Sequence, residues 1–159
     1  KKKTNITLIV ILTILSFSLI AAYIVEYGLG HPPCKLCVYQ RIPYFFSIFL
    51  ILSILITKKY IRPSLFFLAL ISLCGSVLGF YHFGIEQGFF SESLVCEIQN
   101  QDYNLSKEEL LKQLKEKTVS CKDVTFKAFG LSLASINTIF SFILFCIFLK
   151  LYKGYENYR

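Results

Sequence analysis

Four stretches of the chain contain no Asp, Glu, Lys or Arg, and they limit what it can fold into. They cover residues 4–25, 42–57, 63–85 and 128–149. A helix needs about 20 apolar residues to cross about 30 Å of hydrocarbon. Of the 159 residues 55% are hydrophobic and only 17% are charged, whereas an ordinary soluble domain is about 25% charged. The sequence therefore predicts an all-α, polytopic membrane protein, a bundle of four transmembrane helices in a single integral membrane domain over 1–159.

The second uncharged stretch, at 42–57, is short for a span. Extending it backwards gives predicted spans at about 6–25, 38–57, 64–85 and 128–149, with outer loops at 26–37 and 86–127. The extension leaves Arg41 about one turn inside the membrane boundary. An ionisable side chain at that depth is costly and usually functional. The alternative is that Arg41 merely extends its charged head to the lipid headgroups.

The distribution of charge predicts the orientation. The two termini and the connector at 58–62 together hold nine Lys and Arg against one acid, whereas the segments 26–41 and 86–127 on the other side together hold eight against nine. Short positive segments stay in the cytoplasm, so both termini are expected to be cytoplasmic and both outer loops extracytoplasmic. The net charge of +7 is then mostly a consequence of topology, and no nucleic-acid partner is expected.

Four cysteines lie in the predicted outer loops, namely Cys34, Cys37, Cys96 and Cys121. In an oxidising compartment, four cysteines suggest two disulfides. Cys34 and Cys37 form a Cys-x-x-Cys pair at a predicted helix N-terminus, where thiol pKa values are lowered. Arg41 shares their helix face. Purely structural disulfides remain an alternative. A four-cysteine zinc site is disfavoured, because Cys96 and Cys121 are not a close pair, and no metal site is expected.

Two other segments carry local signals. In the long outer loop, Ser106 and Glu109 fit a capping box, and the leucines that follow predict an amphipathic helix on the membrane surface. In the third span, Gly75 and Gly79 form a small-xxx-small pattern that allows close helix packing. His82 follows on the same face near the outer end, as does Glu86. His82 is a candidate site residue, with a structural interhelical hydrogen bond as the alternative.

Two motifs together resemble a known family. The segment Cys34-Lys-Leu-Cys37-Val-Tyr-Gln-Arg41 resembles the Cys-x-Leu-Cys-x-Tyr-Gln/Glu-Arg signature of the DsbB/BdbC disulfide-bond-formation proteins. The segment from Tyr81 to Glu86 resembles their Tyr-His-x-Gly-x-Glu segment, and Cys96 and Cys121 match their second cysteine pair. The VKOR-like quinone reductases, also four-helix disulfide formers, fit less well, because their Cys-x-x-Cys lies late in the bundle.

The resemblance implies a thiol:quinone oxidoreductase of the bacterial inner membrane. Such a protein takes two electrons from a reduced DsbA-like thioredoxin-fold partner and passes them to a membrane quinone, ubiquinone or menaquinone. It implies redox-active disulfides Cys34–Cys37 and Cys96–Cys121. Cys96 is then expected to form the mixed disulfide with the partner, and Cys121 to exchange with Cys34. Cys37 would be the thiolate facing the quinone, with Arg41 and His82 beside it.

Overall fold

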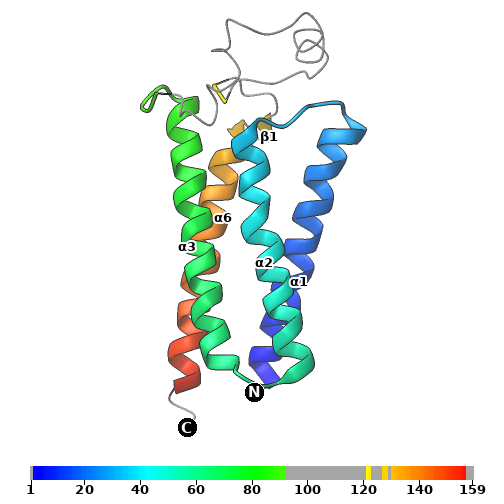
Figure 1. Cartoon of the computed structure of the whole chain (residues 1–159), viewed down its shortest axis with the longest axis vertical. Helices are drawn as coiled ribbons and strands as arrows, with labels where there is room; N and C mark the ends of the chain where they lie inside the picture. The colour runs from blue at the N-terminus through cyan, green and yellow to red at the C-terminus, as the bar shows by residue number, and fades with distance from the viewer. Residues whose placement is uncertain (1, 92–120, 123–126, 129, 157–159) are drawn as a thin grey trace, which may run out of the picture.

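The computed structural model describes residues 2–91, 121–122, 127–128 and 130–156, and within them four long helices stand side by side (Figure 1). The elements are α1 (Lys2–Tyr23), η1 (Ile24–Gly28, a π-helical turn), α2 (Lys35–Thr57), α3 (Ile61–Glu86), β1 (Lys127–Ala128), β2 (Leu131–Ser132) and α6 (Leu133–Glu156). All four long helices are long and apolar enough to cross a membrane. The predicted four-helix membrane protein is confirmed.

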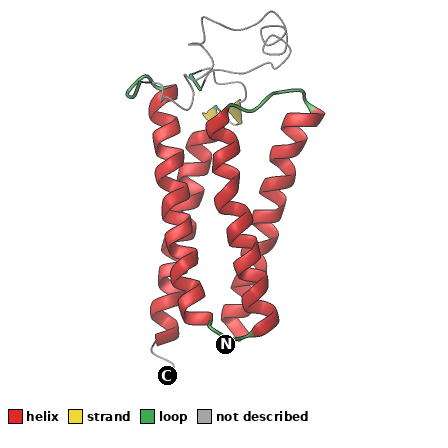
Figure 2. Cartoon of the chain, viewed as in Figure 1, coloured by secondary structure: helices red, strands yellow, loops and turns green. Residues whose placement is uncertain are grey.

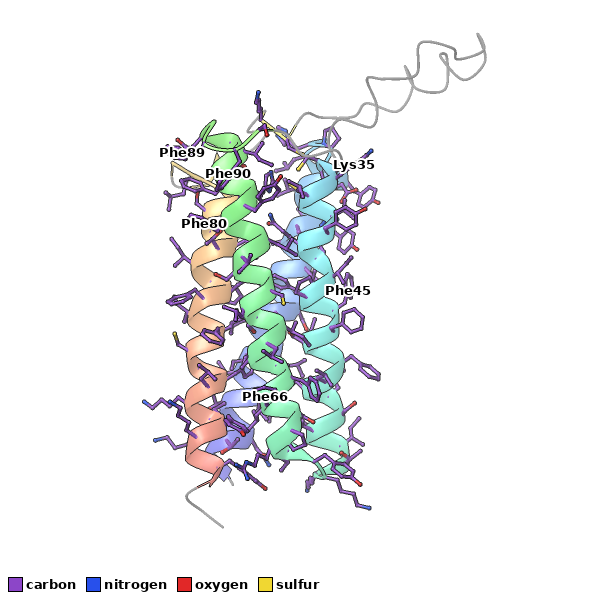
Figure 3. All side chains as sticks on the ribbon, turned by 60° about the vertical axis from the view of Figure 1, so that its left-hand side comes forward. Lys35, Phe45, Phe66, Phe80, Phe89 and Phe90 are labelled. Carbon is purple, nitrogen blue, oxygen red and sulfur yellow. The ribbon has the colours of Figure 1, made fainter. Side chains whose placement is uncertain are left out.

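The distribution of apolar side chains also fits a membrane protein. One buried cluster joins all four helices in the half that holds the termini, with members such as Leu8, Ile51, Leu65 and Phe148. Many large apolar side chains nevertheless lie on the outside, such as Phe45 and Phe66 (Figure 3). A soluble protein of this size rarely exposes a continuous apolar surface, whereas a bilayer covers such a surface at no cost.

Helices α3 and α6 approach each other most closely along the small residues of α3. A Cβ atom at Gly79 would lie 2.7 Å from Thr138 Oγ1, and one at Gly75 would lie 3.3 Å from Ser141 Oγ. Real Cβ atoms do not approach other atoms to 2.7 Å, so the contact at Gly79 requires glycine. The predicted packing role of Gly75 and Gly79 is confirmed, and it holds the outer end of α3 against the bundle.

The first span runs further than its charge pattern indicates. The uncharged stretch stops before Glu26, but the helix continues through η1 to Gly28. It can do so because Glu26 pairs with Arg41 and is not left as a single charge. A π-helical turn inside a helix often marks a functional site, and here it carries Glu26.

The fourth span starts later than expected. Residues predicted as its first turn form β1 and β2, an antiparallel pair with Lys127 opposite Ser132. Gly130, with φ +81°, makes the turn between them. Ser132 then opens α6, where its Oγ accepts a hydrogen bond from the backbone N–H of Ser135.

Both termini lie at one end of the bundle, and β1, β2 and the start of α2 lie at the other (Figures 1 and 2). The connection from α1 to α2 is also at this second end, called here the outer end. The predicted amphipathic helix near Ser106 lies outside the described residues, as does Cys96.

Candidate functional site

Two free cysteines at the start of α2 form the centre of the site. Cys34 is the N-cap of α2, and its Sγ accepts a hydrogen bond from the backbone N–H of Cys37 at 3.3 Å. The two Sγ atoms are 2.9 Å apart, and when Cys34 is ionised the thiol of Cys37 donates to its sulfur. A disulfide has an S–S distance of about 2.05 Å. The predicted Cys-x-x-Cys pair is therefore a dithiol whose sulfur atoms already face each other.

The hydrogen bonds of the pair converge on the sulfur of Cys34. The bond from the Cys37 thiol is the main cause that lowers the pKa of the Cys34 thiol to about 5, while burial acts in the opposite direction. A hydrogen bond and the charge of His82 lower the pKa of Cys34 further. The resemblance gives the acceptor-facing thiolate to Cys37. In the dithiol the thiolate is favoured on Cys34, because the Cys37 thiol, His82 and, to a smaller extent, the backbone N–H at the N-cap all stabilise its charge.

His82 reaches this sulfur from the outer end of α3. The side chain is buried, and its Nε2 lies 3.5 Å from Cys34 Sγ. Its other ring nitrogen, Nδ1, lies 2.9 Å from Nε2 of Gln40 on α2. Nε2 is also 3.7 Å from Oε1 of Glu86. His82 therefore makes an interhelical hydrogen bond and also contacts the dithiol, so the two alternatives left open by the sequence occur together.

A chain of hydrogen bonds continues from His82 into the bundle. Asn137 of α6 donates from Nδ2 to Oε1 of Gln40 at 2.9 Å, and the hydroxyl of Tyr44 donates to Oδ1 of Asn137 at 2.5 Å. Buried amides and hydroxyls require such partners. Since the chain joins α2, α3 and α6, it fixes the three helices relative to one another at the level of the cysteines.

A cavity of about 460 Å³ lies beside the pair, between α1, η1, α2 and α6. Helices α1 and α2 diverge toward this end (Figure 1). Most of the wall is apolar, formed by residues such as Leu19, Ala22, Val25, Leu133, Ile136 and Phe140. One face of α2 supplies polar groups: Cys37, Gln40, Arg41 and Tyr44. Cys34 and His82 lie behind this wall, so Cys37 is the cysteine of the pair that faces the cavity.

Arg41 lies on the cavity wall and does not extend freely to the surface. Its Nη1 forms an ion pair with Oε2 of Glu26 at 2.5 Å, and the two side chains are 14% and 18% exposed. Its guanidinium lies 4.8 Å from the ring centroid of Tyr23, a cation–π contact. These partners hold the charge of Arg41 at the level of Cys37.

Four residues of this site are not predicted from the sequence: Glu26, Gln40, Tyr44 and Asn137. A signal existed for two of them, because Gln40 and Tyr44 follow Cys37 at helical spacing on one face of the second span. Glu26 was read as the end of the first span. Asn137 gave no signal, since a single amide in an apolar stretch has no local partner in sequence.

The long outer loop touches the site through Cys121. This residue is buried with Cys34, Leu36 and Ile85 in one small cluster. It is disulfide-bonded, and its backbone forms a hydrogen bond with the side chain of His82. Cys121 therefore lies on the side of Cys34 that faces away from the cavity. Its predicted pairing with Cys96 falls outside the described residues.

Comparison with known proteins gives a family match over nearly the whole chain. The model of the family described as disulfide bond formation protein DsbB matches residues 3–151. An uncharacterized protein of Rickettsia prowazekii is 29% identical over 159 residues, covering 99% of this chain and 92% of that protein. An SPbeta prophage-derived disulfide bond formation protein B of Bacillus subtilis is 44% identical over 66 residues, which are 42% of this chain and 43% of that protein. No solved structure matches.

Proposed function

This chain belongs to the DsbB family of disulfide bond formation proteins, and on that premise we propose that it is a membrane thiol:quinone oxidoreductase. Its role would be to reoxidise a DsbA-like thioredoxin-fold protein outside the cytoplasm and to pass the electrons to a membrane quinone. The observation that carries the proposal is that Cys37 lines the cavity, while its partner Cys34 is buried and packs against Cys121 of the outer loop. Electrons can then enter the pair from one side and leave on the other.

The cavity suits a quinone headgroup in size and in lining. Its volume of about 460 Å³ lies within the range of about 300–1,000 Å³ that is usual for small-molecule sites. Its apolar wall fits a lipid-soluble ring. Arg41 and the second amide N–H of Gln40 offer hydrogen-bond donors beside Cys37, while Tyr44, whose hydroxyl hydrogen is donated to Asn137, offers an acceptor oxygen. A bound quinone would supply the acceptor for two electrons and two protons, and either ubiquinone or menaquinone has this chemistry.

The residues of the chain divide the remaining work. When the dithiol is oxidised, a bond forms between Sγ of Cys34 and Sγ of Cys37, and two electrons and two protons leave the pair. Cys37 is the sulfur in contact with the cavity. Arg41 holds a fixed positive charge there, which favours the reduced, more negative state of an acceptor. His82 supports the thiolate of Cys34 through Nε2.

Reduction of the pair is proposed to come from the outer loop. Cys96 would form a mixed disulfide with the partner and the partner would leave oxidised, so that Cys96 and Cys121 become the dithiol. Cys121 would then attack Sγ of Cys34 and release Cys37 as a thiolate, and Cys96 would attack Cys121 and release Cys34, which restores the Cys96–Cys121 disulfide and leaves Cys34 and Cys37 as the dithiol. The packing of Cys121 against Cys34 in one buried cluster supports this order of exchange. Each step moves one disulfide and leaves one dithiol behind, so electrons balance throughout.

The proposed location is the bacterial inner membrane, with both termini in the cytoplasm. Nine Lys and Arg against one acid at the end that holds the termini support this orientation. The outer end, with the dithiol, then faces the oxidising compartment where the DsbA-like partner is found.

The test is a turnover assay with the purified full-length chain, a reduced DsbA-type protein, and ubiquinone or menaquinone. Loss of partner thiols should match quinone reduction one disulfide to one quinone. Cys37→Ser should abolish the reaction. The matched control is Cys74→Ser, because Cys74 is a free cysteine of α3 that lies outside the site, and this variant should retain full activity. Thiol loss that proceeds equally well without quinone would refute the proposed acceptor.

A further inference from the structure

Glu86 is a buried carboxylate whose charge is only partly compensated. It is the last residue of α3, and its side chain is 6% exposed. Its Oε1 lies 3.7 Å from Nε2 of His82, while its Oε2 has no hydrogen-bond partner among the described residues. A buried polar atom without a partner costs free energy, and a charged one costs more. An oxygen in this position is suited to receive a cation.

Three further donor atoms converge on the same place. Sγ of Cys34, Sγ of Cys37 and Nε2 of His82 all lie within 4.8 Å of one another. The Glu86 carboxylate is not a member of this group, but its Oε1 is 3.7 Å from Nε2 of His82, so a turn of its side chain is needed to add an oxygen to the two sulfurs and the nitrogen. Thiolate, imidazole and carboxylate are the ligands of protein-bound zinc. This set differs from the four-cysteine site disfavoured by the sequence, because it uses only one of the two cysteine pairs.

The observed spacings can be compared with those of a tetrahedral zinc site. With ordinary zinc–ligand bonds, a sulfur and a nitrogen are about 3.6 Å apart, a nitrogen and an oxygen about 3.4 Å, and two sulfurs about 3.8 Å. The structure has 3.5 Å from Cys34 Sγ to His82 Nε2, and 3.7 Å from that nitrogen to Glu86 Oε1. The two sulfurs, at 2.9 Å, must separate, and Cys37 can move because it lines the cavity.

We propose that Cys34, Cys37, His82 and Glu86 form a zinc site that exists only while the cysteine pair is reduced. Two thiolates and a carboxylate oppose the charge of Zn²⁺, and binding displaces the proton of the Cys37 thiol. In the oxidised pair both sulfurs are joined to each other and neither is a thiolate, so the site is lost. Resting on the proposed function, the consequence is regulatory: zinc in the oxidising compartment would hold the enzyme reduced and stop its turnover.

The effect of a substitution at Gln40 on zinc affinity distinguishes this zinc site from a dithiol that binds no metal. A zinc-bound histidine donates its second ring N–H to an outer partner, and that partner tunes affinity by about 10–100-fold. When zinc occupies Nε2, the N–H is on Nδ1 and faces the Gln40 amide, whose oxygen must turn toward it. A carboxylate accepts that hydrogen without turning. Gln40→Glu should therefore bind zinc about tenfold more tightly than the wild type.

The experiment uses the full-length chain in detergent, with Co²⁺ as a spectroscopic probe and Zn²⁺ measured by competition with a chromophoric chelator. The Cys74→Ser/Cys146→Ser background removes the two exposed free cysteines. The reduced protein should bind one ion and show the sulfur-to-cobalt and tetrahedral d–d bands. The oxidised protein should bind none at the site. Glu86→Gln and His82→Ala should each weaken binding at least about tenfold.

The matched control is Glu26→Gln, which changes a half-buried acid at the outer end that is paired with Arg41 and should leave zinc affinity unchanged. Equal binding to the reduced and oxidised proteins would overturn the site, and so would an unchanged affinity in Glu86→Gln. If Glu86→Gln fails to fold, the tightening in Gln40→Glu decides the question, because its absence contradicts the site. Zinc stoichiometry needs neither quinone nor partner, so these outcomes are independent of the turnover assay that tests the proposed function.

Discussion

Arg41 on α2 and Glu26 in η1 form an ion pair across the mouth of the cavity, fifteen residues apart in the chain. The pair joins α1 to α2 at the level of the cysteines, where the two helices otherwise diverge. It also gives Arg41 a fixed direction. A charge held in place before a reaction stabilises new negative charge better than one that must reorganise.

Changing Arg41 should therefore impair the quinone step. Arg41→Lys keeps the charge but loses the planar guanidinium with several donors, so we expect a weaker apparent affinity for quinone. Arg41→Ala should weaken it more, by about tenfold, which corresponds to about 1.4 kcal/mol. The measurement is the dependence of turnover on quinone concentration. Formation of the mixed disulfide with the partner, measured without quinone, should change much less. If turnover of Arg41→Ala depended on quinone concentration as the wild type does, Arg41 would have no role in the quinone step and would serve only as a membrane anchor.

The acidity of Cys34 should depend on the thiol of Cys37. In the reduced wild type, alkylation of Cys34 should reach half its plateau near pH 5, because the hydrogen bond from Cys37 lowers the pKa of Cys34 to about 5. Cys37→Ala removes this donor and should raise the midpoint by about one unit or more. Cys37→Ser retains a donor and should raise it less. The readout is mass spectrometry of the Cys34 peptide in chelator-treated buffer, and equal midpoints in all three proteins would contradict the assignment.

The lowered pKa of Cys34 also predicts the direction in which the stability of the reduced protein changes with pH. A thiol with a lowered pKa stabilises the folded, reduced protein fully at pH values above its unfolded pKa of about 8.5. That contribution decreases as the pH falls and is lost below about 5. Unfolding of the reduced wild type should therefore become easier from pH 8 to pH 5 by more than unfolding of Cys37→Ala.

The two cysteine pairs should be separable. Cys96→Ser should stop oxidation of the partner, while the Cys34–Cys37 pair should still exchange electrons with quinone, because it lies at the cavity wall. Partner thiol loss and quinone reduction by dithiothreitol, measured on the same preparation, report the two steps. Full activity of Cys96→Ser toward the natural partner would exclude the proposed order of exchange.

The contact between α3 and α6 should tolerate no side chain at Gly79. A Cβ there would lie 2.7 Å from Thr138 Oγ1 and 3.1 Å from its backbone nitrogen, so Gly79→Ala should lower the free energy of unfolding by about 1–3 kcal/mol. The control is Gly154→Ala, since a Cβ at Gly154 meets nothing within 4 Å and alanine favours helix by up to about 1 kcal/mol. Unfolding in micelles should move the two variants in opposite directions.

The orientation can be tested by labelling from outside the cell. An impermeant maleimide should label Cys96 after reduction, whereas Cys121, which is buried against Cys34, should react less. A cysteine introduced by Lys59→Cys, in the connector between α2 and α3, should stay unlabelled until the membrane is permeabilised. Labelling of the Lys59→Cys protein in intact cells would reverse the proposed topology.

The features that could be predicted from sequence are those written in a local pattern. Charge-free stretches gave the four helices, and the spacing of Gly75 and Gly79 gave the packed face of α3. The Cys-x-x-Cys pair and its place at a helix N-terminus were also local. These features follow from helix geometry and from the cost of charge in lipid.

The cavity wall could not be predicted, because its members find one another only in three dimensions. Gln40 and Asn137 are 97 residues apart and meet through uncharged amides, which hydropathy reads as minor interruptions of a span. The predicted end of the first span was placed too early at Glu26, because a charge normally ends a span. Only the pairing of Glu26 with Arg41 allows the helix to continue. In each case a partner distant in the sequence removes the free-energy cost of an unpaired polar or charged side chain within the membrane.

The burial of Cys34 also has a consequence for which sulfur of the disulfide an attacking thiol can reach. Its sulfur belongs to a side chain that is 6% exposed and lies under Cys121, while Cys37 opens toward the apolar cavity. A small soluble thiol should therefore reach the disulfide that these two residues form more readily at Cys37 than at Cys34. The two sulfur atoms, although only 2.9 Å apart, thus have different surroundings, so that exchange with a second disulfide at Cys34 and exchange with an acceptor in the cavity at Cys37 do not compete for the same atom.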